Sequence, residues 1–228
     1  MIEPFLLFDI NDSTFIDLSD NSFPSILRTW HGNSFDLEEN STHFGFVFED
    51  NIDILKDTKS FKIYKDMYFS INCESKLKPQ KNSKGFVVSR IGYNGFFNIG
   101  GEIENKGRYK YIDGCSDSLL ISPVKFGDPC LNLLYFPKNI NQTPHTHPSL
   151  RIGMIVKGEG FCLLDDQEIE LKSGKVFIIN ENILHSFKTI DSEMLIVVYH
   201  PESDFGPTDN NHPMINKTII NGISASFQ

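Results

Sequence analysis

The sequence predicts an all-β protein, either a sandwich or a barrel. Short apolar runs recur at intervals of about ten residues, and Gly, Asn, Asp and Pro separate them. The 228 residues include 20 phenylalanines, which suit pleated, half-buried strands, as β-branched residues do. Long helical patterns are hard to find. A single helix could lie near residues 115–122.

The runs that we expect to form strands extend from the first quarter of the chain almost to its end. In order they are HFGFVF (43–48), FKIYKDMYFSI (61–71), GFVVSRIGY (85–93), LNLLYF (131–136), RIGMIV (151–156), GFCLL (160–164), KVFIIN (175–180) and MLIVVYH (194–200). The final segment, 199–228, is interrupted by three prolines and would pack against the first half or a partner subunit.

Composition excludes several classes of function. The net charge is −9 and the pI is near 5.2, so the basic surface that nucleic acid requires is not expected. No segment approaches the roughly 18 apolar residues of a membrane span, and the N-terminus does not resemble a signal peptide. The four cysteines are dispersed, as is typical of buried thiols in a cytosolic protein. We therefore expect a cytoplasmic protein that binds neither nucleic acid nor membrane.

A comparison of the chain with itself indicates an internal duplication. One shift of 108 residues aligns three predicted strands without a gap, which favours two related halves over chance. The aligned pairs are RIGMIV (151–156) on HFGFVF (43–48), GKVFIIN (174–180) on DMYFSIN (66–72), and LIVV (195–198) on VVSR (87–90). We expect an N-terminal unit at 1–99, a crossover at 100–129 and a C-terminal unit at 130–228.

Two histidines one residue apart, His145 and His147, precede the run that begins at position 151. On a β-strand they would share one face, about 6.6 Å apart along the strand, so both imidazoles could reach one ion. Two ligands seldom hold a metal alone, and His185, at the start of another run, offers a third. The alternative is that the pair belongs to a polar stripe on a solvent-facing strand.

The segment HTHPSLRIGMIVKG (145–158) resembles the first motif of the cupin superfamily. That motif reads H-x-H, three or four residues, Glu, six residues and Gly, and His145, His147 and Gly158 stand at its positions. The segment GKVFIINENILHSF (174–187) resembles the second motif, which reads Gly, five residues, Pro-x-Gly, two residues and His.

Gly174 and His185 match that second motif, whereas Asn180 and Asn182 stand where Pro and Gly are expected. The resemblance covers residues 130–200 well, and the duplication extends it to the first half. It implies a bicupin, that is, tandem double-stranded β-helix (jelly-roll) barrels, which commonly associate as homodimers.

The resemblance also implies a metal inside the mouth of the C-terminal barrel, held by the three histidines. Three ligands leave coordination positions open, as in reactive rather than structural sites. One divalent ion per chain is expected, with Fe favoured and Ni, Zn or Mn as alternatives. The shift of 108 residues places Leu37, Glu39 and Leu77 at the ligand positions of the first half. That half should therefore be a degenerate, metal-free barrel.

Arg151 is the main departure from the family pattern, because it stands where the fourth ligand, usually Glu, belongs. An arginine cannot coordinate a cation. It could instead receive the carboxylate of a substrate as a bidentate partner, which would make it a catalytic-site residue. Alternatively, it could be a rim arginine paired with Glu159 or Glu170. His200 and His212 could approach the site or belong to a packed tail.

The leading hypothesis is a metal-dependent enzyme acting on a small anionic molecule, with dioxygenase-type oxidation favoured. A non-redox lyase or isomerase using a Lewis-acid metal is the first alternative. The second is a non-enzymatic protein that binds a metal and a metabolite. The cupin resemblance is nearly silent on the reaction, since this fold hosts many chemistries.

Overall fold

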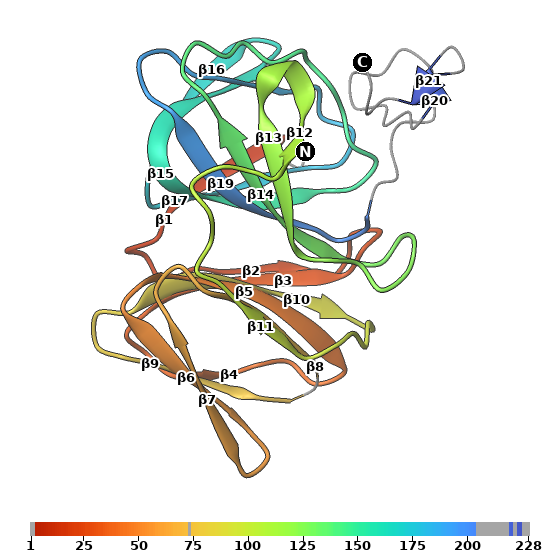
Figure 1. The fold of residues 1–228 in the computed structure, drawn as a ribbon. Helices are drawn as coiled ribbons and strands as arrows, with labels where there is room; N and C mark the ends of the chain where they lie inside the picture. The colour runs from red at the N-terminus through yellow and green to blue at the C-terminus, as the bar shows by residue number, and fades with distance from the viewer. Residues whose placement is uncertain (1–2, 73, 204–218, 221–222, 225–228) are drawn as a thin grey trace.

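Two lobes of β-strands are stacked on each other (Figure 1). The computed structural model describes residues 3–72, 74–203, 219–220 and 223–224. The N-terminal lobe comprises residues 15–100, and the C-terminal lobe comprises residues 5–9 and 109–200. The prediction of an all-β fold is confirmed.

The N-terminal lobe contains a six-stranded and a four-stranded sheet, both antiparallel. Its strands are β2 (Phe15–Leu18), β3 (Ser25–His31), β4 (Phe35–Asp36), β5 (Ser41–Glu49), β6 (Asn51–Lys56), β7 (Lys59–Tyr64), β8 (Tyr68–Asn72), β9 (Lys76–Pro79), β10 (Lys84–Ile91) and β11 (Asn98–Gly100). The strand orders are β11-β8-β5-β10-β3-β2 and β4-β9-β6-β7.

The C-terminal lobe contains a nine-stranded sheet. Its strands are β1 (Phe5–Asp9), β12 (Tyr109–Lys110), β13 (Ser116–Ile121), β14 (Cys130–Phe136), β15 (Arg151–Leu164), β16 (Gln167–Lys172), β17 (Lys175–Ile179), β18 (Ser186–Lys188) and β19 (Met194–His200). The main order is β1-β17-β15-β19-β14-β13-β12, and β16 and β18 pair with the second half of the long strand β15.

Outside these sheets, a 3-10 turn spans Ile112–Gly114, and β20 (Ile219–Ile220) pairs with β21 (Ile223–Ser224). The helix considered near residues 115–122 was wrong, because this segment forms β13. Its Ser-Asp-Ser-Leu-Leu-Ile sequence pairs with β14 along its length. Pairing with a buried neighbour decides the structure of so short a segment, since intrinsic helix propensity is a weak preference.

The first strand of the chain belongs to the C-terminal lobe, although the sequence places it in the N-terminal unit. β1 pairs with β17, with Phe5 opposite Ile179 and Leu7 opposite Phe177. The Phe5 ring also stacks on Phe177, at 5.8 Å between centroids. β1 therefore covers the β17 edge of the large sheet and ties the start of the chain to the C-terminal lobe.

The same local packing recurs in the two lobes at the spacing predicted from the sequence. Gly45 lies opposite Phe69 in the β5–β8 pair, and Gly153 lies opposite Phe177 in the β15–β17 pair. Each ring covers its glycine closely. A Cβ would lie 2.2 Å from the Phe69 ring or 2.3 Å from the Phe177 ring.

The third aligned strand does not keep that spacing. Gly45 pairs with Val87 on β10, whereas Gly153 pairs with Val198 on β19. The partners are thus 111 residues apart rather than 108, and the alignment of 195–198 with 87–90 was wrong by three residues. The additional residues lie between β17 and β19, in the segment that carries His185.

Three apolar cores fill the molecule, one inside each lobe and one between them. Alternate side chains of a central strand point to different cores: Ile152 and Met154 of β15 join the core between the lobes, and Ile155 joins the core of the C-terminal lobe. The central strands are therefore buried on both faces, which explains their continuous apolar runs. By the same alternation, Arg151 faces the interior of the C-terminal lobe.

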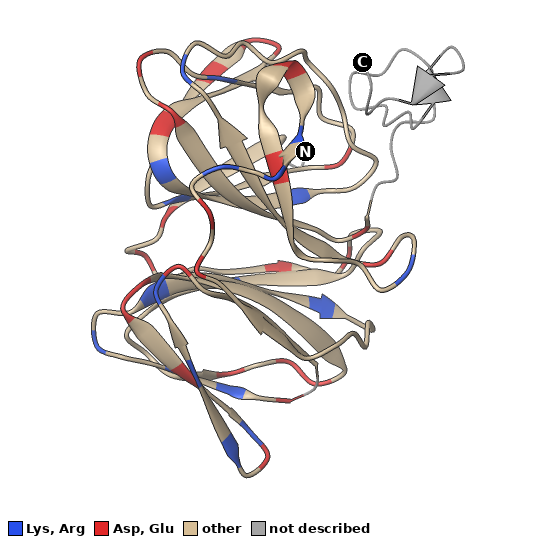
Figure 2. Ribbon diagram, viewed as in Figure 1, with Lys and Arg blue, Asp and Glu red and all other residues tan. Residues whose placement is uncertain are grey.

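The surface bears charges of both signs. Figure 2 shows Lys and Arg interspersed with Asp and Glu over both lobes. Within the described ranges, the structure has no helix long and apolar enough to cross a membrane. Cys115, Cys130 and Cys162 are buried free thiols.

The position of β1 predicts the effect of shortening its side chains. Phe5→Ala should lower the free energy of unfolding by about 3 kcal/mol, because it removes an aromatic contact from the core of the large sheet. Leu7→Ala, on the same strand but 36% exposed, should cost below about 1 kcal/mol. Urea unfolding of both variants gives the comparison, and equal small losses would show that β1 adds little to the C-terminal lobe.

Candidate metal centre

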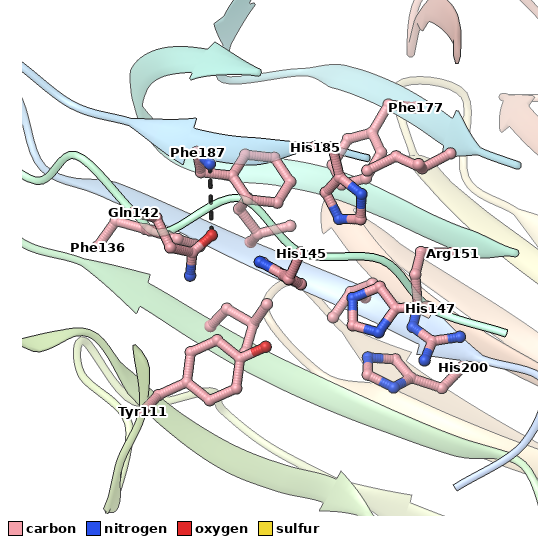
Figure 3. A pocket seen from close by; sticks show the side chains of 14 residues that line it. Tyr111, Phe136, Gln142, His145, His147, Arg151, Phe177, His185, Phe187 and His200 are labelled. Carbon is pink, nitrogen blue, oxygen red and sulfur yellow. Dashed lines mark hydrogen bonds between the residues drawn. The ribbon is translucent and has the colours of Figure 1, made fainter. Parts of the chain in front are cut away.

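The three histidines predicted as ligands lie together in the C-terminal lobe. His145, His147 and His185 are buried, and their candidate ligand atoms all lie within 4.8 Å of one another. The ring centroids are 4.8–5.3 Å apart. Figure 3 shows the three rings gathered in one pocket.

The prediction that His145 and His147 lie on a regular strand was wrong. They occupy the loop before β15, and the backbone of His145 forms an isolated bridge with His185. His145 N donates to His185 O at 2.9 Å, and His185 N donates to His145 O at 3.0 Å. This reciprocal pair joins the two motif segments directly.

Backbone carbonyls fix the tautomers of two of the histidines. His145 Nδ1 donates to Thr143 O at 2.9 Å, and His185 Nδ1 donates to Ile183 O at 2.8 Å. Because a carbonyl oxygen only accepts, both protons must reside on Nδ1. Each Nε2 then carries the lone pair that a metal requires, an arrangement typical of histidine ligands. The donor set therefore fits a divalent transition metal.

The departures from the second motif have a structural explanation. Asn182, which stands where the motif has Gly, has a φ of +61°, and Asn is among the few residues other than Gly that tolerate this left-handed conformation. Its N–H donates to His147 O at 2.7 Å. The turn is thus preserved without glycine and helps to hold the first motif in place.

Gly158 matches the first motif because no side chain fits at its position. Its φ is +75°, and a Cβ would lie 1.8 Å from Glu193 O. β15 passes this close to the segment before β19 just beyond the register shift between Ile155 and Lys157. The glycine therefore lets one long strand run from the large sheet to its pairing with β16.

Arg151 is inside the pocket rather than on its rim. The residue is only 3% exposed. Its Nη1 donates to Ser149 Oγ at 2.6 Å, Ser149 O at 3.1 Å and Leu150 O at 3.0 Å. Glu170, one of the acids considered as its partner, instead pairs with Lys172 at 2.8 Å.

The pocket disfavours positive charge on its histidines. Burial first, and then the Arg151 charge, hold the pKa of His147 well below its usual value. Burial and the neighbouring His145 lower the pKa of His185 to about 3. These rings are therefore neutral at pH 7, the form that binds metal.

Three further polar residues line the pocket: Tyr111, Gln142 and His200. His200, which the sequence left undecided, ends β19 with its ring 6.4 Å from that of His147. Burial of that ring, followed by the Arg151 charge, lowers its pKa well below the usual value. His212, considered beside it, lies outside the described residues.

Sequence reasoning missed Tyr111 and Gln142. Gln142 carries no recognisable pattern, although it lies only three residues before His145. Tyr111 belongs to the segment that the sequence assigned to the crossover, so only the tertiary structure brings it to the pocket.

The pocket is small and largely apolar. Its wall is formed by aromatic and aliphatic side chains, and its cavity volume of about 20 Å³ is enough for one or two waters. Phe187 contacts Phe136 and Phe177, with ring centroids 5.3 and 5.9 Å away. An ion and a few ligand atoms fit without rearrangement, whereas an aromatic ligand would require these rings to move.

The corresponding place in the N-terminal lobe is built differently. Leu37 N donates to Ser75 O at 2.8 Å, as His145 N donates to His185 O. The counterpart of His185 is therefore Ser75 and not Leu77, which follows from the change in spacing. His43 takes the place of Arg151, is fully buried and has its Nδ1 2.8 Å from Ser89 Oγ.

Comparisons with known proteins agree with this architecture. The chain is similar to the solved structure of a cupin 2 conserved barrel domain protein from Leptotrichia buccalis, with a TM-score of 0.63 and 14% identity, over 85% of this chain and 95% of that one. The chain has a cupin fold. Residues 136–201 of this cupin also match the family model for the AraC-like ligand binding domain.

Two other solved structures are similar to this cupin. Protein Ylba from E. coli has a TM-score of 0.61 and 18% identity, over 88% of this chain and 92% of that one. Salicylate 1,2-dioxygenase from Pseudoaminobacter salicylatoxidans, solved as adducts with gentisate, has a TM-score of 0.62 and 7% identity, over 86% and 80%. No match was found among curated proteins.

The low pKa of His185 predicts how stability depends on pH in the metal-free protein. The unfolded chain protonates His185 near pH 6.5 and the folded chain only near pH 3, so stability falls as the pH drops through this window. His185→Asn should reduce the slope between pH 6.5 and 5 by about 1.4 kcal/mol per pH unit. Urea unfolding with a chelator measures it.

His31→Asn is the matched control, because His31 is exposed and its replacement should leave the slope unchanged. Identical slopes for wild type and His185→Asn would contradict the low pKa.

Proposed function

We propose that this cupin is a metal-dependent enzyme acting on a small carboxylate-bearing molecule. The observation that carries the proposal is a buried three-histidine cluster with a buried arginine in the same pocket. His145, His147 and His185 would hold the metal, and Arg151 would hold the carboxylate.

A charged arginine among histidines needs an anionic ligand to offset it. The acceptors of its Nη1 are a hydroxyl and two carbonyl oxygens, which are neutral. The Arg151 charge contributes to the low pKa of His147, His185 and His200, so its field reaches the whole cluster. A divalent ion there adds positive charge, and a carboxylate between the ion and the guanidinium would stabilise both.

The dioxygenase-type reaction is the form of the proposal that we favour. Iron would supply redox chemistry with O₂, whereas zinc, nickel or manganese would supply a Lewis acid for a lyase or isomerase. The similarity to salicylate 1,2-dioxygenase supports the former, although at 7% identity it extends only to the fold. The protein's own contribution would be to orient the acid through Arg151 and to exclude water with the phenylalanine wall.

A second candidate is a non-enzymatic binder of a metal and a metabolite. The match of residues 136–201 to a ligand-binding family favours it, since this range contains the whole predicted site. Elemental analysis of the isolated protein, followed by O₂ uptake with a panel of carboxylic acids, separates the candidates. Iron with acid-dependent uptake supports the dioxygenase; another metal with turnover supports the non-redox enzyme; tight binding without turnover supports the binder.

We also propose that the chain is a bicupin that arose by duplication, with a degenerate N-terminal barrel. The recurrence of the glycine–phenylalanine packing at 45 and 69 and at 153 and 177 supports this. A homodimer formed through sheet edges is part of the proposal, with β2 and β12 at the edges of the two large sheets. A monomer in sedimentation analysis at micromolar concentration would contradict it.

The first functional prediction concerns the metal. His147→Ala should leave a folded protein with at least tenfold lower metal occupancy, because the remaining two histidines are too few ligands. Elemental analysis and circular dichroism measure the two properties, with His31→Ala, which removes an exposed histidine, as the control. An unfolded His147→Ala protein, or one with unchanged metal, would indicate that the histidines are structural.

The second functional prediction concerns Arg151. Arg151→Gln should keep the metal but weaken binding of small carboxylic acids by about ten- to a hundredfold, the loss of roughly 1.5–3 kcal/mol from a charge-assisted pair. Arg151→Glu should weaken acid binding further and raise metal affinity, because it adds a fourth ligand. Calorimetric titration with metal and with acids measures both effects.

Lys157→Gln is the control for charge alone, because Lys157 lies on the same strand but points to solvent, paired with Glu193. Equal acid affinity in wild type and Arg151→Gln would exclude a role for Arg151 in binding the anion.

A further inference from the structure

The pocket contains a second polar group, Gln142, whose amide is almost fully buried. Gln142 is 2% exposed and lines the same pocket as the three histidines. Its backbone N donates to Phe187 O at 3.0 Å, and its side-chain Oε1 accepts from Phe187 N at 3.3 Å. β18 therefore holds both the backbone and the side chain of this residue.

These contacts fix which way the amide points. Because the Phe187 N–H is a donor, the amide atom that faces it must be the oxygen, so the NH₂ group lies on the other side. Figure 3 shows Nε2 on the side away from Phe187. In the part of the chain that the structure describes, this NH₂ group donates to no protein acceptor. A buried donor among phenylalanines is costly unless a ligand accepts from it.

Gln142 and Arg151 lie at opposite sides of the metal cluster. Gln142 precedes His145 by three residues and Arg151 follows His147 by four. In Figure 3 the Arg151 guanidinium lies beside His147 and His200, and Gln142 lies on the other side of His145. The Tyr111 hydroxyl projects toward the histidines from the Gln142 side.

Building on the proposed function, we infer that the ligand is a short acid with oxygen acceptors at both ends, such as a small dicarboxylate. One carboxylate pairs with Arg151, and the far oxygen accepts from Gln142 Nε2, with the Tyr111 hydroxyl as a second donor. Both ends of the pocket present donors, which disfavours amines and acids with an apolar far end. The small cavity volume limits the ligand to a few atoms between its two ends.

The test compares malonate with propionate, acids of three carbons that differ in the second carboxylate. Calorimetric titrations use the full chain loaded with zinc, so that binding is measured without turnover. Wild type should bind malonate at least tenfold more tightly than propionate. Gln142→Leu should remove about tenfold of malonate affinity and leave propionate affinity unchanged, because only malonate reaches the amide.

Two further variants separate a ligand contact from a structural role. Gln142→Glu keeps the acceptor for the Phe187 N–H but replaces the donor by a negative charge, so it should weaken malonate binding more than Gln142→Leu does. Tyr111→Phe should lower malonate affinity in the same direction. Metal content and thermal stability of each variant show whether the site is intact.

The outcomes distinguish this inference from the function on which it rests. If Gln142→Leu binds metal and both acids as wild type does, while Arg151→Gln still weakens both acids, the inference is overturned and the proposed function stands. If wild type holds zinc but binds neither acid, the proposed anion site fails as well. A Gln142→Leu protein that loses equal affinity for both acids would show that the residue only supports the fold of the pocket.

Discussion

The reciprocal backbone hydrogen bonds between His145 and His185 are the contact on which the site depends. The two residues are 40 positions apart in the sequence, and these bonds, at 2.9 and 3.0 Å, bring both imidazoles to one place. Neighbouring carbonyls orient the rings, and the turn at Asn182 binds the carbonyl of His147. The geometry of the cluster is therefore fixed by the backbone, so that it can exist before a metal arrives.

The large sheet supplies the rigidity that such a cluster needs. Its central strands are buried on both faces, one toward the N-terminal lobe and one toward the interior of the C-terminal lobe. Contacts such as Phe44 with Tyr199, 5.3 Å between centroids, join the two lobes. The N-terminal lobe thus covers the back of the sheet that carries Arg151, and β1 covers its edge beside β17. A metal-free lobe can in this way contribute to a metal site in the other.

Much of this structure could be predicted from the sequence, because its signals are local. The β-branched and aromatic runs indicated the strands, and the spacing of three histidines indicated the cluster. What could not be predicted depends on pairing between distant segments. The exchange of β1 into the C-terminal lobe, the three additional residues before β19 and the approach of Tyr111 have no local signal. Asn182 shows a different limit, since a motif can lose its glycine where asparagine adopts the same left-handed backbone.

The central claim is that three histidine side chains hold one metal ion per chain. X-ray absorption spectroscopy on the metal-loaded full chain counts the imidazoles bound to the ion most directly. Three imidazole ligands at about 2.0–2.1 Å, with oxygen ligands completing the shell, are predicted for zinc. A protein that retains no stoichiometric metal after loading, or an ion bound without imidazole nitrogen, would contradict the account.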